Sequence, residues 1–141
     1  MEKDRVLILC TGNAARSQMA EAFLKKYAGD QFEAYSAGSE PKGIHPLTRK
    51  VMEEVGLALN DQYSKGVKDF LGKMIFQYLI IVCAKAEQHC PTTFPGIMQR
   101  IYWPFEDPVA FTGSEEEKLA KFREVRDKIE ERVKLWLREL L

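Results

Sequence analysis

The sequence lacks an excess of charge of either sign, and it has few cysteines. Its 141 residues carry 21 Lys and Arg against 21 Asp and Glu. It therefore has no basic surplus for a large nucleic-acid-binding face, and no nucleic-acid partner is expected. Only three cysteines are present. In a cytoplasmic protein they indicate catalysis, metal binding or redox exchange rather than a static disulfide framework.

Long apolar runs are also missing. No segment approaches the roughly 20 apolar residues of a membrane-spanning helix, and residues 1–4 lack the charged-then-apolar layout that opens a signal peptide. We therefore expect a cytoplasmic protein with no membrane partner. The length is typical of a single domain over residues 1–141, and the sequence contains no repeat, linker or low-complexity tract.

Apolar segments alternate with helical patterns along the chain. Strands are expected over residues 5–9, 32–36, 78–82 and 100–103, and helices over residues 17–28, 45–55, 64–74 and from 114 onward. The helix over 64–74 is the weakest, because it contains Gly66 and Gly72. The last helix has the strongest start, because Ser114 and Glu117 form a capping box. Strands that alternate with helices predict an α/β fold with a parallel sheet.

The segment from Cys10 to Ser17 joins the first strand to the first helix. Such a turn directs backbone N–H groups and the positive helix end into the loop, which favours a thiolate at Cys10 and an oxyanion beside it. Gly12 and Asn13 tolerate the positive φ angles of a ring of inward N–H groups, and Arg16 can hold two oxygens at once. The Gly-Lys-Ser/Thr ending of a nucleotide P-loop is missing. The predicted oxyanion-binding residues are Thr11, Gly12, Asn13, Ala14, Ala15, Arg16 and Ser17.

This Cys-x5-Arg-Ser opening resembles the low-molecular-weight protein tyrosine phosphatase superfamily. The resemblance implies a three-layer sandwich with a central parallel sheet of about four strands and helices on both faces. It also implies that a late Asp-Pro pair, here Asp107-Pro108, supplies the general acid, with Glu106 as the fallback. A departing oxygen must be protonated, so the acid has a chemical role. Trp103 and Phe105 are expected to pack beside it and could form a wall of the substrate site.

Two further thiols point to one branch of this superfamily. Cys83 ends the strongest strand, and Cys90 follows seven residues later, directly before a proline. The thioredoxin-coupled arsenate reductases carry such a pair at this place, and this chain is also similar to them over residues 17–21, 35–38 and 122–127. The phosphatases of the superfamily have no use for the second and third thiols.

The resemblance implies a three-thiol relay. Cys10 would attack arsenate, Cys83 would attack Cys10 to release arsenite, and Cys90 would attack Cys83. Thioredoxin would then reduce the Cys83–Cys90 disulfide, since two thiolates can supply two electrons by disulfide exchange. The expected catalytic residues are therefore these three cysteines with Arg16 and Asp107. The expected partners are an arsenate or phosphate oxyanion and thioredoxin, and the protein is expected to act as a monomer without a cofactor or a metal.

Three alternatives remain open from the residues. The protein could be a phosphatase that hydrolyses phosphate monoesters through a Cys10 phospho-enzyme. It could be a non-catalytic oxyanion sensor that switches by disulfide formation. A zinc site built from Cys83, His89 and Cys90 is the third, although the spacing is unusual for zinc and a fourth ligand is missing.

The sequence departs from the arsenate reductases at two places. Ala14 and Ala15 stand where Ser and Cys are frequent, which leaves the three-thiol relay intact. Some members bind potassium through residues that match Asn13, Glu21 and Ser36, together with a further acid. Lysine stands at position 65, where that acid is expected. The ammonium group could take the place of the cation, so we expect no dependence on potassium.

Overall fold

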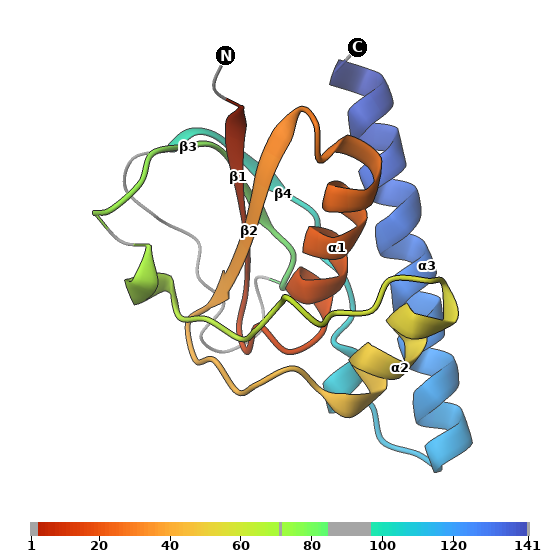
Figure 1. The fold of residues 1–141 in the computed structure, drawn as a ribbon. Helices are drawn as coiled ribbons and strands as arrows, with labels where there is room; N and C mark the ends of the chain where they lie inside the picture. The colour runs from red at the N-terminus through yellow and green to blue at the C-terminus, as the bar shows by residue number, and fades with distance from the viewer. Residues whose placement is uncertain (1–2, 71, 85–96, 141) are drawn as a thin grey trace.

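The computed structural model describes residues 3–70, 72–84 and 97–140. Its centre is a sheet of four strands, all parallel, in the order β2-β1-β3-β4 (Figure 1). The strands are β1 (Asp4–Cys10), β2 (Phe32–Gly38), β3 (Phe76–Ile81) and β4 (Ile97–Tyr102). The α/β class with a four-stranded parallel sheet is therefore confirmed.

Strand β1 lies in the middle of the sheet and ends at Cys10, where the loop before α1 begins. Its residues from Val6 to Cys10 are at most 2% exposed, as expected for a strand covered on both faces. Leu9 pairs with Ala37 of β2 and with Ile81 of β3. The carboxyl ends of these three strands therefore meet at one edge of the sheet, where parallel α/β folds bind their ligands. The end of α3 lies at the opposite end of the molecule (Figure 1).

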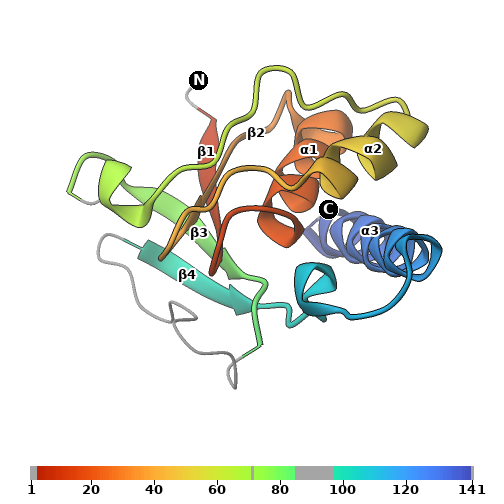
Figure 2. The same cartoon turned by 90° about the horizontal axis from the view of Figure 1, so that it is seen from below.

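Three α-helices pack together on one side of the sheet, and the short helix η1 (Val67–Asp69) lies on the other (Figure 2). The α-helices are α1 (Arg16–Ala28), α2 (Pro46–Glu54) and α3 (Glu115–Leu140), and a second short helix, η2 (Pro108–Ala110), precedes α3. None of the described helices has the length and apolar character needed to cross a membrane.

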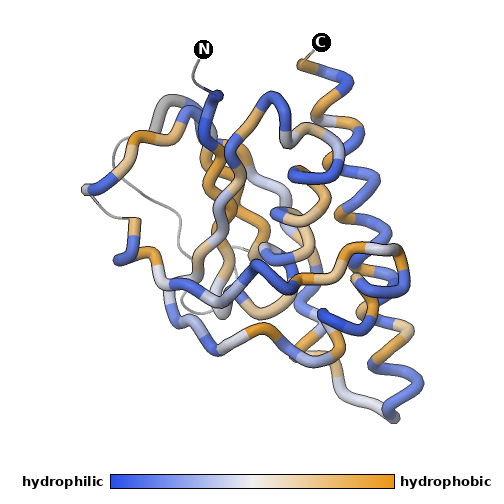
Figure 3. Tube along the Cα trace, viewed as in Figure 1, coloured by the Kyte–Doolittle hydropathy of each residue, from blue (hydrophilic) through white to orange (hydrophobic). Residues whose placement is uncertain are grey.

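Helix α3 closes the core with a stripe of apolar side chains. Its buried apolar residues are Phe122, Val125, Ile129, Val133 and Trp136, spaced three or four apart. Figure 3 shows the result as alternating hydrophobic and hydrophilic colours along this helix. The Trp136 ring lies 5.5 Å from that of Phe32 and 5.2 Å from that of Tyr78, between centroids. The helix begins as the capping box predicts, because the Ser114 and Glu117 amides each bond the other's side chain.

The expectation of a helix over residues 64–74 is wrong. Among residues 64–70 and 72–74, which the structure describes, only the single turn η1 is helical. Gly66 instead forms a parallel bridge with Gly38, and the N–H of Gly38 donates to the carbonyl of Lys65 at 2.9 Å. Gly72 has a φ of 73°, a left-handed value that ends a helix. The chain is therefore extended through Gly66, and this brings Lys65 beside the loop that follows β1.

Candidate active site

The loop between β1 and α1 is shaped by the segment that follows β2. The carbonyls of Cys10, Thr11 and Gly12 accept N–H groups from residues 39, 40 and 42, at 3.3, 2.9 and 3.0 Å. These carbonyls therefore point outward, which leaves the loop N–H groups free to face inward, as an anion requires. Gly38 permits the close approach, because a Cβ there would lie 2.5 Å from the Thr11 carbonyl oxygen.

Cys10 lies at the bottom of this loop as a free, buried thiol. Its Sγ lies 2.8 Å from Ser17 Oγ, and the N–H of Asn13 donates to the same sulfur at 3.1 Å. Helix α1 begins at Arg16, so its positive end faces the thiol. The nucleophile predicted from the sequence therefore lies among hydrogen-bond donors.

Asn13 fixes the direction of these hydrogen bonds. Its φ is 48°, a left-handed value that asparagine adopts more readily than most residues. Its Oδ1 accepts from the N–H of Lys65 at 2.8 Å, so Nδ2 is the donor to Ser17 Oγ at 2.7 Å and Ser36 Oγ at 2.9 Å. Ser17 Oγ accepts this hydrogen, and its own hydroxyl hydrogen can be donated to Cys10 when the sulfur is a thiolate.

A buried carboxylate anchors the other end of this network. Ser36 Oγ donates to Glu21 Oε1 at 2.5 Å. Glu21 also pairs with Lys25 at 2.6 Å and faces the Nζ of Lys65 at 3.7 Å. Burial lowers the pKa of Lys65, and the charge of Glu21 opposes that effect. The amino group of Lys65 thus lies beside Glu21, where the sequence led us to expect it in place of a potassium ion.

Arg16 and Asp107 face each other at the mouth of the loop. The Arg16 side chain is only 3% exposed; one nitrogen donates to the carbonyl of Phe105 at 3.1 Å and another lies 3.7 Å from Asp107 Oδ2. Asp107 also accepts the N–H of Val109 at 3.0 Å, which holds the carboxylate at the start of η2. Glu106, the fallback acid, lies 3.2 Å from Lys121 of α3 instead. The geometry therefore favours Asp107 as the acid.

A cavity of about 80 Å³ occupies the mouth of the loop. It is lined by Cys10, Thr11, Gly12, Ala14, Ala15, Arg16, Lys42, Asp107 and Val109. This lining includes five of the seven predicted oxyanion-binding residues, while Asn13 and Ser17 do not line the cavity and support the thiol instead. Sequence reasoning missed Lys42 and Val109, because an exposed lysine and valine carry no sequence signal of their own.

Cys83 follows β3 at the same edge of the sheet as Cys10. The pairing of Leu9 with Ile81, and the Val82 N–H that donates to the Leu9 carbonyl at 2.9 Å, set the two cysteines on neighbouring strand ends. Cys83 is fully buried and disulfide-bonded. Cys90 and His89 lie outside the described residues. Of the predicted relay the structure therefore describes only Cys10 and Cys83, and of the zinc alternative only Cys83. The described residues contain no group of three His, Cys, Asp or Glu side chains that could hold a metal.

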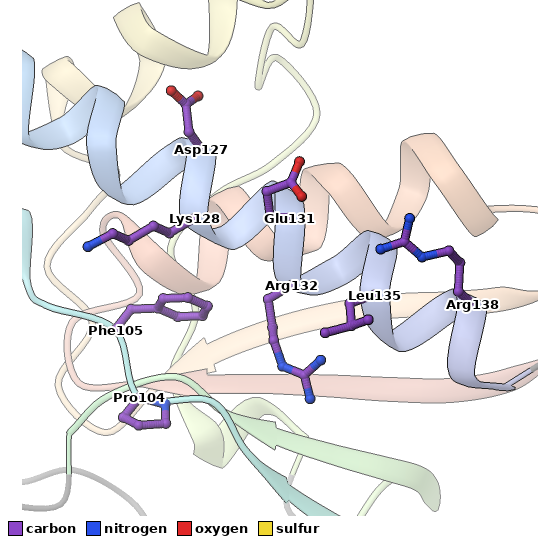
Figure 4. Close-up of a pocket in the computed structure, with 8 residues that line it drawn as sticks. All are labelled: Pro104, Phe105, Asp127, Lys128, Glu131, Arg132, Leu135 and Arg138. Carbon is purple, nitrogen blue, oxygen red and sulfur yellow. The ribbon is translucent and has the colours of Figure 1, made fainter.

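Trp103 and Phe105 do not line the oxyanion cavity, so they do not form the wall of the substrate site that the sequence left possible. Trp103 is buried against Trp136, with ring centroids 5.8 Å apart. The Phe105 side chain instead lines a separate cavity of about 580 Å³ against α3, where Pro104 and Leu135 also lie (Figure 4). Phe105 thus serves the site through its backbone carbonyl, which holds Arg16.

The fold and this loop together define a phosphatase-like class of protein. Residues 5–141 match the family model of low molecular weight phosphotyrosine protein phosphatase, and the chain belongs to that family. Within the family, its similarity is to arsenate reductases. The arsenate reductase of Halalkalibacterium halodurans is 42% identical over 135 residues, which cover 95% of each chain. The resemblance drawn from the sequence is thereby confirmed.

Solved structures give the same result. An arsenate reductase in the phosphate binding state superimposes with a TM-score of 0.80 at 28% identity, covering 98% of this chain and 99% of the other. A thioredoxin-dependent arsenate reductase from Corynebacterium glutamicum has a TM-score of 0.57 at 28% identity, covering 94% of this chain and 63% of its own.

Proposed function

We propose that this protein reduces arsenate to arsenite through Cys10, Cys83 and Cys90, with thioredoxin as the electron donor. The observation that carries the proposal is the position of Cys83 on the strand end next to Cys10, which itself lies at an oxyanion-sized cavity. The similarity to arsenate reductases over nearly the whole chain supports the same reaction. The C. glutamicum neighbour is a thioredoxin-dependent arsenate reductase, which supports thioredoxin as the donor.

The first half of the reaction is a displacement at arsenic. The loop N–H groups and Arg16 bind three arsenate oxygens, and the sulfur of Cys10 attacks from below. The S–As bond forms as the bond to the fourth oxygen breaks, and Asp107 donates the proton with which that oxygen leaves as water. Arg16, held by Phe105, stabilises the charge that develops on the bound oxygens.

The second half transfers two electrons. Cys83 attacks the sulfur of Cys10, and the S–As electron pair stays on arsenic, which leaves as arsenite. Cys90 then attacks Cys83, so that the Cys10 thiolate departs and a Cys83–Cys90 disulfide remains for a dithiol reductant to reopen. A free Cys10 beside a disulfide-bonded Cys83 is compatible with the end of this sequence.

Phosphate monoester hydrolysis is the second candidate, because the family is one of phosphatases and the same loop and acid would serve it. The cavity argues against aryl esters as the main substrate, since it is small and none of the described residues that line it is aromatic. A sensor role is less favoured, because a sensor needs no acid opposite Arg16. We further propose that the protein is a cytoplasmic monomer.

The test is arsenate-dependent oxidation of NADPH with thioredoxin and thioredoxin reductase. Wild type should turn over, while Cys83→Ser and Cys90→Ser should not. Both variants should still hydrolyse p-nitrophenyl phosphate, because Cys10 and Asp107 remain, whereas Cys10→Ser should lose both reactions. Brisk ester hydrolysis without any arsenate-dependent oxidation in wild type would instead make the protein a phosphatase.

A further inference from the structure

Lys42 lies at the mouth of the oxyanion cavity, although no motif of the chain includes it. It belongs to the segment after β2, and its N–H donates to the carbonyl of Gly12 at 3.0 Å. Its side chain lies beside Gly12, since Cδ lies 3.8 Å from the place of a Cβ on that glycine. Lys42 therefore lines the cavity together with Arg16 and Asp107. It forms no ion pair within the part of the chain that the structure describes.

The position of Lys42 places it near the one substrate oxygen that does not face the loop. Three oxygens of a tetrahedral anion face the loop, and Cys10 attacks opposite the fourth, which therefore points to the mouth. Asp107 is placed there to protonate it. Apart from Asp107, Lys42 and Val109 are the described lining residues that lie outside the loop, so we expect them to meet whatever the fourth oxygen carries.

Inorganic oxyanions and esters differ at this oxygen. In arsenate or phosphate it is a hydroxyl or an oxide, which is small and accepts a charge-assisted hydrogen bond well. In a monoester it carries a carbon group, which is bulkier and must leave the cavity past Lys42 and Val109. An ammonium group at this place favours the first kind of ligand and gains little from the second.

We propose that Lys42 is a specificity-determining residue that favours free inorganic oxyanions over phosphate monoesters. The proposal deepens the proposed function, on which it rests for the identity of the substrate. The selection itself is a property of binding at the loop and needs no turnover.

The test measures how ligands protect Cys10 from alkylation by iodoacetamide, with Cys10 modification followed by mass spectrometry. Inorganic phosphate and arsenate are compared with phenylphosphonate, an aryl dianion that has carbon in place of the fourth oxygen. Lys42→Met should raise the Kd of both inorganic anions roughly ten-fold, the usual effect of losing a hydrogen bond to a charged group. The Kd of phenylphosphonate should change by less than about three-fold, since only the general attraction of charge is lost.

Two further variants complete the comparison. Lys42→Arg should stay close to wild type, because it keeps the charge and the donors. Lys50→Met should bind all three anions as wild type does, because it removes an exposed lysine of α2 that does not line the cavity. Equal weakening of inorganic anions and phenylphosphonate by Lys42→Met, or no weakening, would overturn the proposal. Absence of arsenate reduction would contradict only the proposed function, because the protection assay does not depend on it.

Discussion

Lys65 and Glu21 form a buried ion pair, with Lys65 Nζ 3.7 Å from Glu21 Oε1 and side-chain exposures of 7% and 5%. Glu21 accepts a hydrogen bond from Ser36, which in turn accepts one from Asn13. The pair therefore stands at the far end of the network that ends on Cys10. A fixed cation belonging to the chain thus faces the charge of that carboxylate where water is scarce.

Turnover and thermal stability should consequently be the same in KCl and NaCl at equal ionic strength. The measurement is arsenate-dependent NADPH oxidation, with Tm followed in parallel, in each salt. A marked rise in rate or Tm that is specific to potassium would contradict the role of Lys65.

Lys65→Met should lower the free energy of unfolding by about 3 kcal/mol or more, as is usual when one partner of a buried ion pair is removed. Lys25→Met is the matched control, because Lys25 pairs with the same Glu21 but is 39% exposed. It should cost less, since water can replace an exposed partner. Urea unfolding of both variants measures the two losses in free energy of unfolding. Equal losses would contradict a larger contribution from the buried Lys65 than from the exposed Lys25.

Two substitutions of Asn13 distinguish the contribution of its backbone conformation to stability from that of its side-chain hydrogen bonds. Asn13→Ala should lose roughly 2–4 kcal/mol, because the buried hydroxyls of Ser17 and Ser36 lose their donor and alanine resists a φ of 48°. Asn13→Gly loses the same side chain but accepts the backbone angle, so it should be about 1 kcal/mol more stable than the alanine variant. Denaturant unfolding of the two variants gives the difference, and a more stable alanine variant would contradict the argument.

Asp107→Asn should lower kcat for arsenate reduction by at least about 100-fold, the usual contribution of a general acid. Glu106→Gln should stay within about two-fold of wild type, because Glu106 faces Lys121 rather than the cavity. Steady-state kinetics of the two variants shows which of the two neighbouring carboxylates acts as the general acid. A large loss in Glu106→Gln with an active Asp107→Asn would reverse the assignment.

Helices α2 and α3 are joined by Glu54, which bonds Arg123 at 2.6 Å and Arg126 at 2.8 Å. The hydrogen bond from Arg123, supported by Arg126, lowers the pKa of Glu54 from 4.5 to about 2. Because the folded-state pKa is the lower one, this stabilisation is complete above pH 4.5 and disappears as the pH falls toward 2. As the pH falls from 4.5 toward 2, the free energy of unfolding of Glu54→Gln should therefore decrease less than that of wild type. Urea unfolding at pH 6, 4 and 3 measures the difference, and parallel profiles would contradict it.

The loop could be predicted from the sequence because its information is local. The residues that define it lie within seven positions, from Cys10 to Arg16. The cysteine supplies the thiol, Gly12 and Asn13 tolerate positive φ angles, and the arginine binds oxygens. The mouth of the site could not be predicted in this way. Lys42, Val109 and the Phe105 carbonyl reach it only through the pairing of β1 with its neighbours and the course of the chain after β2 and β4.

The error over residues 64–74 has the same origin. The segment has enough helical pattern to be assigned as a helix in isolation. In the fold, however, Gly66 bridges Gly38 and Lys65 bonds Asn13, two contacts with residues far away in the sequence. The pairing of Cys83 with Cys90 stays a prediction, because Cys90 lies outside the described residues.

The carbonyl of Phe105 that holds Arg16 also has a consequence for biosynthesis. Cys10 is translated before the groups that complete its surroundings, the amide of Lys65 and the carbonyl of Phe105. A nascent chain therefore carries the reactive thiol long before it can bind an anion there. The site can therefore become chemically competent only after Phe105 has been translated.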